Sequence, residues 1–209
     1  MVQTPKESYN FDVQEGGNAE DLANDIAAAA HHEAGHAVIA ASTGVRLRKE
    51  GIMVGQDGKG LSCYCYQPSK PDGSIEASVI TSYSGFIAEN RFRKLAGLPE
   101  RHPQVLEDSE DWGYARRFAS NFADVYLAGR SLGRVQSDLK EQAMLAVAAN
   151  WPAIESLAQE LRSRQWERKK ALNSGGKWSD AEMAKYVLGD EIVTLLIPFG
   201  INAVCVETC

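Results

Sequence analysis

The chain has 209 residues, of which 44% are hydrophobic and 24% charged, a composition typical of one globular domain and unlike that of a disordered segment. The formal net charge of −6 argues against nucleic-acid binding, which normally requires a basic surface. The N-terminus is polar, and the longest apolar run, from Ile192 to Val206, is too short to span a bilayer, so we expect a cytoplasmic protein without a membrane segment.

The first part of the chain predicts a loose arm followed by a long helix. Residues 1–17 are polar and contain glycine, which is typical of a flexible terminus. Asn18 is a good helix N-cap, the residues after it are rich in alanine, and Gly44 is a natural stop. We therefore predict a helix over residues 19–43.

Residues 45–68 predict a small sheet, because short β-prone pieces alternate there with glycine-rich turns. One strand ends at Pro68, and its alternation puts Leu61, Cys63 and Cys65 on one face and Ser62, Tyr64 and Tyr66 on the other. With Cys205 and Cys209 the chain has four cysteines. No signal peptide is visible at the polar N-terminus, so we expect reduced thiols. The two cysteine pairs could bind a metal, but no second pair stands at zinc-finger spacing.

The rest of the chain is predicted to be largely helical. Turn and capping signals delimit further helices over residues 75–96, from about Ser109 into the 120s, and over 135–150, 152–169 and 179–188. The expected fold class is mainly α with a small β-sheet (α+β). We expect one domain over residues 18–190, with the apolar C-terminal segment 191–209 packed on it.

The sequence His32-Glu33-Ala34-Gly35-His36 fits the pattern H-E-x-x-H on the first predicted helix. Side chains four residues apart on a helix lie above one another, so both imidazoles can reach one metal ion. Zn²⁺ at this site lowers the pKa of a water molecule and polarises a carbonyl group, and Glu33 is placed to act as the catalytic base. The alternative is that both histidines are ordinary helix residues, but two histidines flanking a glutamate on an alanine-rich turn favour the metal.

A catalytic zinc site usually has three protein ligands, so a third must come from elsewhere in the chain. The acidic segment before the third helix offers several carboxylates, and Glu89 in the second helix is a rival. His31 faces another direction and is expected either to be a bystander or to support the ligands indirectly, and His102 has no assignable role. The candidates in the acidic segment are Glu107, Asp108, Glu110 and Asp111.

Residues 27–43, AAAAHHEAGHAVIAAST, resemble the active-site helix of the FtsH-type ATP-dependent zinc metalloproteases, whose motif is typically HEAGHA. Residues 82–92 are similar to that family's GGRxAE helix at Gly85, Ala88 and Glu89, but depart from it at Ser84 and Phe86. In the family a third helix begins with an aspartate zinc ligand followed by alanines four and eight residues later. The matching residues here are Asp111, Ala115 and Ala119.

The resemblance covers about residues 25–188 and implies a zincin-like, mostly helical peptidase fold with Asp111 as third ligand and Glu89 in a supporting role. It also implies that the strand within GKGLSCYCYQP pairs with extended polypeptide substrate. The alternative is an ordinary edge strand without a role in substrate binding, which would have the same sequence pattern. The family's ATPase and membrane segments have no counterpart in this chain. A separate ATPase is therefore a possible partner, and ring-like homo-oligomers are possible because family members form them.

Three functions fit these features. The first is a zinc metalloendopeptidase with His32, His36 and Asp111 as ligands and Glu33 as general base. The second is a non-catalytic metal-binding adaptor or regulatory module with the peptidase fold, against which the intact motif argues. The third is metal-dependent hydrolysis of another amide or ester, which the motif alone does not distinguish from peptide hydrolysis.

Overall fold

The computed structural model describes residues 19–55, 60–64, 74–102, 107, 109–126, 131–164 and 186–207. The predicted arm over residues 1–17, the end of the predicted strand after Tyr64 and most of the predicted helix over 179–188 lie outside these residues, as do Asp108, Cys65 and Cys209.

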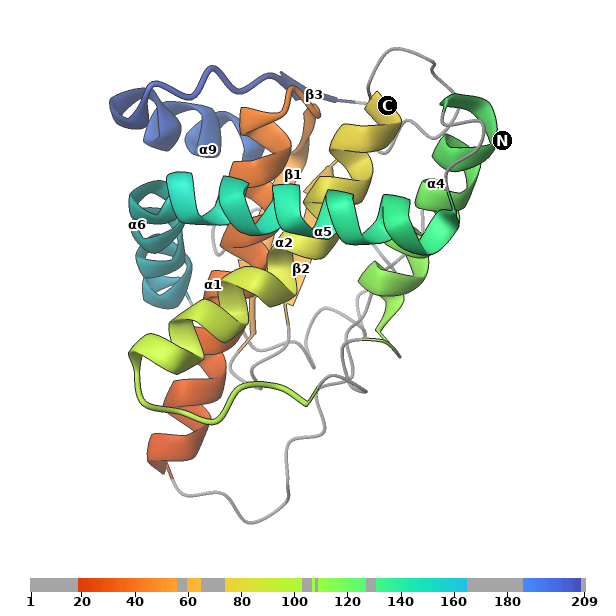
Figure 1. Ribbon diagram of the computed structural model, residues 1–209. Coiled ribbons are helices and arrows are strands. Elements are labelled where there is room, and N and C mark those ends of the chain that lie inside the picture. Colours follow the sequence, from red (N-terminus) through yellow and green to blue (C-terminus); the bar gives the residue numbers. More distant parts are fainter. Residues whose placement is uncertain are drawn as a thin grey trace, which may run out of the picture.

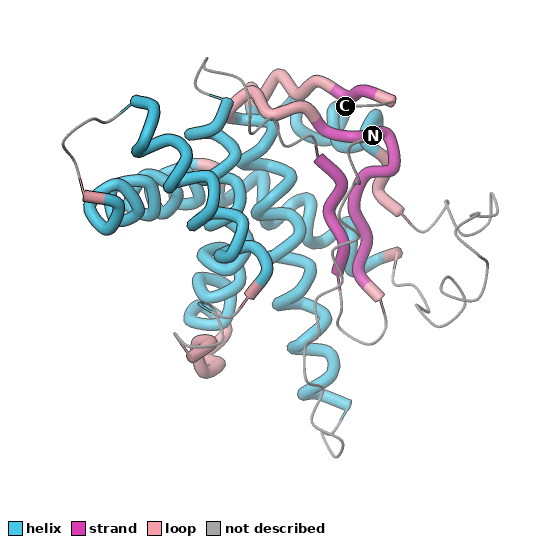
Figure 2. Tube along the Cα trace, turned by 90° about the vertical axis from the view of Figure 1, so that its right-hand side faces the viewer, coloured by secondary structure: helices cyan, strands magenta, loops and turns pink. Residues whose placement is uncertain are grey.

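The described residues are mainly helical and include one small sheet, which confirms the predicted α+β class (Figure 1). Figure 2 shows that the strands gather on one side of the helical body. The helices are α1 (Ala19–Ser42), α2 (Ser74–Leu95), α4 (Glu110–Tyr126), α5 (Leu132–Ala149), α6 (Trp151–Ser163) and α9 (Gly189–Leu196), with a short 3-10 helix η1 (Ile197–Phe199). The strands are β1 (Leu47–Val54), β2 (Gly60–Tyr64) and β3 (Cys205–Val206).

Helix α1 forms the centre of the fold, and every residue from Ile26 to Ala41 is buried. It packs against α2, α6 and the sheet, so it has no solvent-facing side over these turns. A helix that is buried on all sides needs small or apolar residues around its whole circumference, which the alanine-rich sequence provides. The polar motif residues on α1 are therefore surrounded by protein.

Gly35 allows α1 and α2 to pack closely beside the motif. A Cβ atom at Gly35 would lie 2.7 Å from the Ala88 Cβ and 2.9 Å from the Ser84 carbonyl oxygen on α2. Ser84 Oγ also donates a hydrogen bond to the Gly35 carbonyl at 3.2 Å. Any larger residue would force the two helices apart, which accounts for a glycine inside a helix despite its poor helix propensity.

The sheet has the strand order β2-β1-β3. Strands β1 and β2 are antiparallel, with Ile52 opposite Ser62, whereas β3 joins β1 in parallel, with Leu47 opposite Cys205. Strand β2 is therefore an edge strand on the side of the sheet away from β3. The small sheet predicted over residues 45–68 is confirmed, and the C-terminal strand is an addition that the sequence analysis did not predict.

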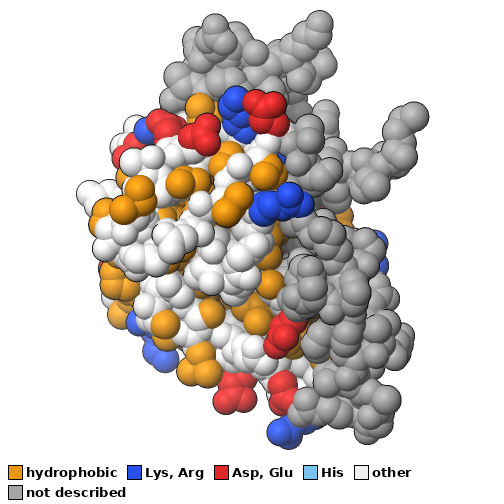
Figure 3. Space-filling model, turned by 90° about the horizontal axis from the view of Figure 1, so that it is seen from above, with side chains coloured by type: hydrophobic (Ala, Val, Ile, Leu, Met, Phe, Trp, Pro, Cys, Tyr) orange, Lys and Arg blue, Asp and Glu red, His pale blue; other side chains and the backbone are white. Residues whose placement is uncertain are grey.

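The C-terminal segment is attached to the domain through one face. Ile192, Leu196 and Ile201 are buried, whereas Ile197 is 65% exposed and Val204 is 55% exposed. Arg164 at the end of α6 holds α9, because its guanidinium donates to the Glu191 carboxylate. The segment is thus only partly buried, and Figure 3, which views the molecule from above, shows apolar side chains scattered over the visible face.

One expectation for this region needs correction. The helix predicted to end at residue 188 does not extend there, because Tyr186 is in a bend and Val187 forms an antiparallel bridge with Ile52. Helix α9 begins at Gly189 and so includes the first residues of the C-terminal segment 191–209. No helix within the described residues has the length and apolar character that a membrane crossing requires.

Candidate metal centre

Three side chains from two helices converge at one point. His32 and His36 stand one turn apart on α1, and Asp111 lies in the first turn of α4. The two Nε2 atoms are 3.1 Å apart, and Asp111 Oδ2 lies 3.1 Å from His32 Nε2 and 2.8 Å from His36 Nε2. All three side chains are buried, so the convergence does not arise from flexible surface groups.

The other nitrogen of each imidazole is fixed by a hydrogen bond. His36 Nδ1 donates to the Thr81 carbonyl oxygen at 2.8 Å, and His32 Nδ1 donates to Glu89 Oε2 at 3.3 Å. Because a carbonyl oxygen can only accept, the proton of a neutral His36 resides on Nδ1. Both rings are therefore oriented so that their Nε2 lone pairs face the same point, as metal-ligating histidines require.

These donors fit a tetrahedral zinc ion. With Zn–N and Zn–O distances of roughly 2.0–2.2 Å, two ligand atoms of a tetrahedron lie about 3.3 Å apart. The three separations between the donor atoms, from 2.8 to 3.1 Å, are slightly shorter than this. Two imidazoles and one carboxylate leave the fourth position for a water molecule or substrate, as in catalytic rather than structural zinc sites. His32, His36 and Asp111 can thus hold Zn²⁺.

Glu89 contacts the nitrogen of His32 that points away from the cluster. Its Oε1 accepts hydrogen bonds at 2.8 Å from both Arg93 Nε and Arg101 Nε, while its Oε2 faces His32. Burial alone would raise the pKa of Glu89, but His32 and the two arginines outweigh burial and lower it to about 2. The carboxylate is therefore ionised, and it holds the His32 ring in place without approaching the point where the two Nε2 atoms meet.

The protein groups alone give His32 an elevated pKa. Burial by itself would lower it, but the hydrogen bonds to Asp111 and Glu89 outweigh burial and raise the pKa to about 10. The same contacts with the two histidines lower the pKa of Asp111, again against the effect of burial. The centre is therefore built to hold positive charge, either as a proton or as a metal ion.

Zinc binding near pH 8 is expected to displace about one proton from His32, in addition to the proton that zinc-bound water loses near pH 7. In the metal-free protein His32 is protonated below its pKa of about 10, whereas a zinc ligand must be a neutral imidazole. The apparent zinc association constant should therefore rise at least about tenfold per pH unit between roughly pH 7 and 9. Calorimetric titration in two buffers of different ionisation enthalpy measures the total proton count, and a count no higher than about one would show that His32 is already neutral.

Glu33 lies beside the cluster without belonging to it. It is 1% exposed, and its Oε2 accepts a hydrogen bond from Ser62 Oγ on strand β2. Burial raises the pKa of Glu33, while the neighbouring His32 and His36 and the Ser62 hydroxyl oppose the increase. A carboxylate with a raised pKa next to a metal centre is well suited to accept and return a proton.

Gly85 on α2 provides the space in which the imidazoles meet. A Cβ atom there would overlap His36 Nε2 and would lie 2.8 Å from His32 Nε2. Gly60 on β2 provides similar space for Glu33, because a Cβ at Gly60 would overlap the Glu33 carboxylate. In the sequence, Gly85 stands out only within a family pattern and Gly60 does not stand out, since neither contact is visible before the chain is folded.

Replacing Gly85 with alanine is expected to weaken zinc binding by at least about tenfold, because the added methyl displaces both Nε2 atoms. Gly113→Ala on α4 is a matched control, since a Cβ there meets nothing within 4 Å. Its higher helix propensity should leave zinc binding unchanged and stabilise the protein by up to about 1 kcal/mol. Competition with a fluorescent zinc chelator measures both affinities, and equal values would rule out steric displacement at Gly85.

The structure separates the remaining sequence candidates. Glu107 and Glu110 are exposed, and neither is part of the converging cluster, whereas Glu89 contacts the outer nitrogen of His32. Asp108 lies outside the described residues. Asp111 is the carboxylate that the fold brings to both Nε2 atoms, among those predicted as possible third ligands that lie within the described residues.

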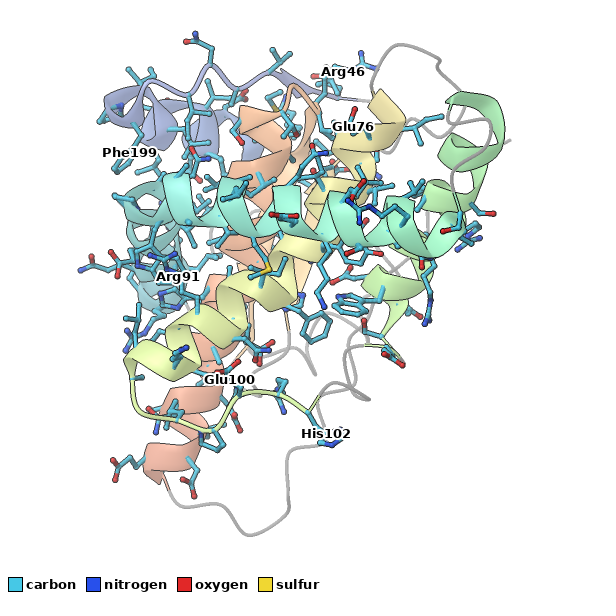
Figure 4. All side chains as sticks on the ribbon, viewed as in Figure 1. Arg46, Glu76, Arg91, Glu100, His102 and Phe199 are labelled. Atoms are coloured by element: carbon cyan, nitrogen blue, oxygen red, sulfur yellow. The ribbon has the colours of Figure 1, made fainter. Side chains whose placement is uncertain are left out.

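The two other histidines lie away from this cluster. His31 is buried, donates from Nδ1 to the Ala27 carbonyl oxygen at 2.7 Å and stacks on Phe92 and Trp151. Burial lowers its pKa, so it is a neutral core residue, in agreement with its predicted role as a bystander. His102 is exposed, and Figure 4 shows it on the segment after α2, pointing away from the helices.

No protein-family model matches this sequence, and no curated protein matches it either. The function is therefore inferred from the residues and geometry of the site.

Proposed function

We propose that the chain is a zinc metalloendopeptidase, FtsH-peptidase-like and zincin-like in its HExxH helix, that hydrolyses polypeptide substrates. The observation that carries the proposal is the convergence of His32 Nε2, His36 Nε2 and Asp111 Oδ2, with the buried carboxylate of Glu33 beside them. Zn²⁺ bound by these three groups would activate a water molecule and polarise the substrate carbonyl.

The reaction places two demands on the protein itself. Glu33 takes a proton from the attacking water and gives it to the leaving amine, which requires a carboxylate whose pKa is high enough for it to act in both directions. The burial of Glu33 favours this, because it raises the pKa. The second demand is a fixed orientation of the two imidazoles, which the hydrogen bonds to Glu89 and to the Thr81 carbonyl provide.

Strand β2 is the proposed binding edge for substrate. It pairs with β1 on one side, and none of the described strands pairs with its other side. The strand lies next to the motif, since Ser62 contacts Glu33 and the Tyr64 ring lies 5.8 Å from the His36 ring. An extended peptide that adds to this edge through its backbone would lie near the metal centre, with little demand on its sequence.

The proposal is tested by measuring metal content and peptide hydrolysis on the same preparation. We expect one zinc ion per chain, cleavage of extended peptides from a mixed library, and loss of cleavage with a chelator that zinc addition reverses. A separate ATPase would be needed only for folded substrates, so unfolded peptides are the appropriate first substrate. Bound zinc without cleavage of any peptide would favour the non-catalytic binding module instead.

A further inference from the structure

Strand β2 contacts the Glu33 carboxylate in two ways. Ser62 Oγ donates a hydrogen bond to Glu33 Oε2 and lies 3.4 Å from the Glu33 main-chain carbonyl oxygen. Gly60, two residues earlier on the same face of the strand, lies so close to Glu33 that a Cβ atom would overlap the carboxylate. The side chain of Glu33 is therefore confined between its own helix and the edge strand.

The two carboxylate oxygens of Glu33 differ in their surroundings. Oε2 is occupied by the Ser62 hydroxyl, whereas Oε1 is buried and has no hydrogen-bond partner among the described residues. A buried acceptor without a protein partner is costly unless water or a ligand satisfies it. One oxygen is thus fixed by the protein while the other keeps its lone pairs for a group that the protein does not supply.

From this contact we infer that Ser62 is a positioning residue, which holds one oxygen of the Glu33 carboxylate so that the other faces the reacting water. The inference rests on the proposed peptidase function and adds a residue outside the H-E-x-x-H motif to its machinery. It also links the base directly to the strand proposed to bind substrate, because Ser62 belongs to that strand. No bond to substrate is made or broken by Ser62.

If Ser62 has a positioning role, its hydroxyl group is needed for catalysis, whereas a merely structural role needs only a side chain of similar shape. Ser62→Thr keeps the hydroxyl, and Ser62→Val has the same shape as threonine without it. Both are β-branched and suit a strand, so the pair isolates the hydrogen bond from packing. Ser163→Ala, at the exposed end of α6, serves as a remote serine control.

With the zinc-loaded full chain and an extended peptide substrate, we expect Ser62→Val to lower kcat by about tenfold or more, since the lost bond is charge-assisted. KM and zinc stoichiometry should stay at their original values. Ser62→Thr should restore most of kcat, and Ser163→Ala should leave all three quantities unchanged. Equal kcat for the valine and threonine variants, or a loss confined to KM or zinc content, would overturn the positioning role.

A second measurement does not depend on catalysis. Ser62→Val should lower the urea midpoint of the zinc-loaded protein, and it should lower it less in a Glu33→Ala background, where the partner carboxylate is absent. Equal shifts in both backgrounds would show that the contact is not made and would overturn the inference while leaving the peptidase proposal standing. Coupling in a protein that cleaves no peptide would refute the peptidase proposal, and the positioning role with it.

Discussion

Glu33→Gln is expected to lower peptide hydrolysis by about 10²- to 10⁴-fold while one zinc ion per chain stays bound. Glutamine has nearly the shape of glutamate but cannot accept a proton from water at neutral pH, so the variant removes general-base catalysis. Zinc should be retained because Glu33 is not among the three groups whose ligand atoms converge. The measurement is kcat/KM on an extended peptide, together with elemental analysis of the same sample.

Glu110→Gln is the control for that experiment, because Glu110 is exposed on the first turn of α4 and lies outside the cluster. It should keep both activity and zinc. A Glu33→Gln protein that cleaves peptides at the original rate would refute the role assigned to Glu33. A variant that has lost zinc as well would instead place Glu33 among the groups that hold the ion.

Replacing Asp111 with alanine is expected to weaken zinc binding by more than about 100-fold, since even the residues that orient zinc ligands contribute about 10- to 100-fold. The substitution removes the oxygen that lies 2.8 Å from His36 Nε2 and 3.1 Å from His32 Nε2. It also leaves buried imidazoles without their anionic partner, which should destabilise the metal-free protein by on the order of 3 kcal/mol. Zinc competition and urea unfolding measure the two effects.

Glu107→Ala and Glu110→Ala separate Asp111 from its neighbours, since all three come from the same acidic segment and Glu107 and Glu110 are exposed. Neither control should change the zinc affinity. If one of them abolishes zinc binding and Asp111→Ala does not, the third ligand has been assigned to the wrong residue.

The part of the candidate metal centre whose residues are close together in the sequence could be predicted. His32, Glu33 and His36 are within one helical turn, so their spacing alone fixes their relation. The third candidate ligand, Asp111, comes from α4, 75 residues after His36, and residue types alone left several carboxylates open. The family resemblance favoured Asp111, which the fold brings to both imidazoles.

The support around the centre was less accessible, because it depends on contacts between distant segments. The Ser62 hydroxyl reaches Glu33 across 29 residues of sequence, and nothing in the composition of that strand marks it. Glu89 was predicted to play a supporting part, but its arginine partners became visible only in the fold.

In the fold, too, the elements with local sequence signals were predicted and those that depend on distant contacts were not. Helices α1, α2, α4, α5 and α6 were predicted from helix propensity, capping residues and stop signals, because these signals are local. Strand β3 was missed, since a two-residue strand has no alternation to detect and its partner Leu47 lies near the other end of the chain. Val187 was assigned to a helix because an apolar residue suits either a helix face or the bridge that it forms with Ile52.

The donor atoms of the centre belong to residues as many as 79 positions apart, His32 and Asp111. An ion shared between them would act as a reversible cross-link that closes this long loop, and part of its binding energy would appear as folding energy. The lifetime of the folded chain would then follow the supply of zinc in its surroundings. A shortage of zinc would then lower the amount of folded protein as well as its activity.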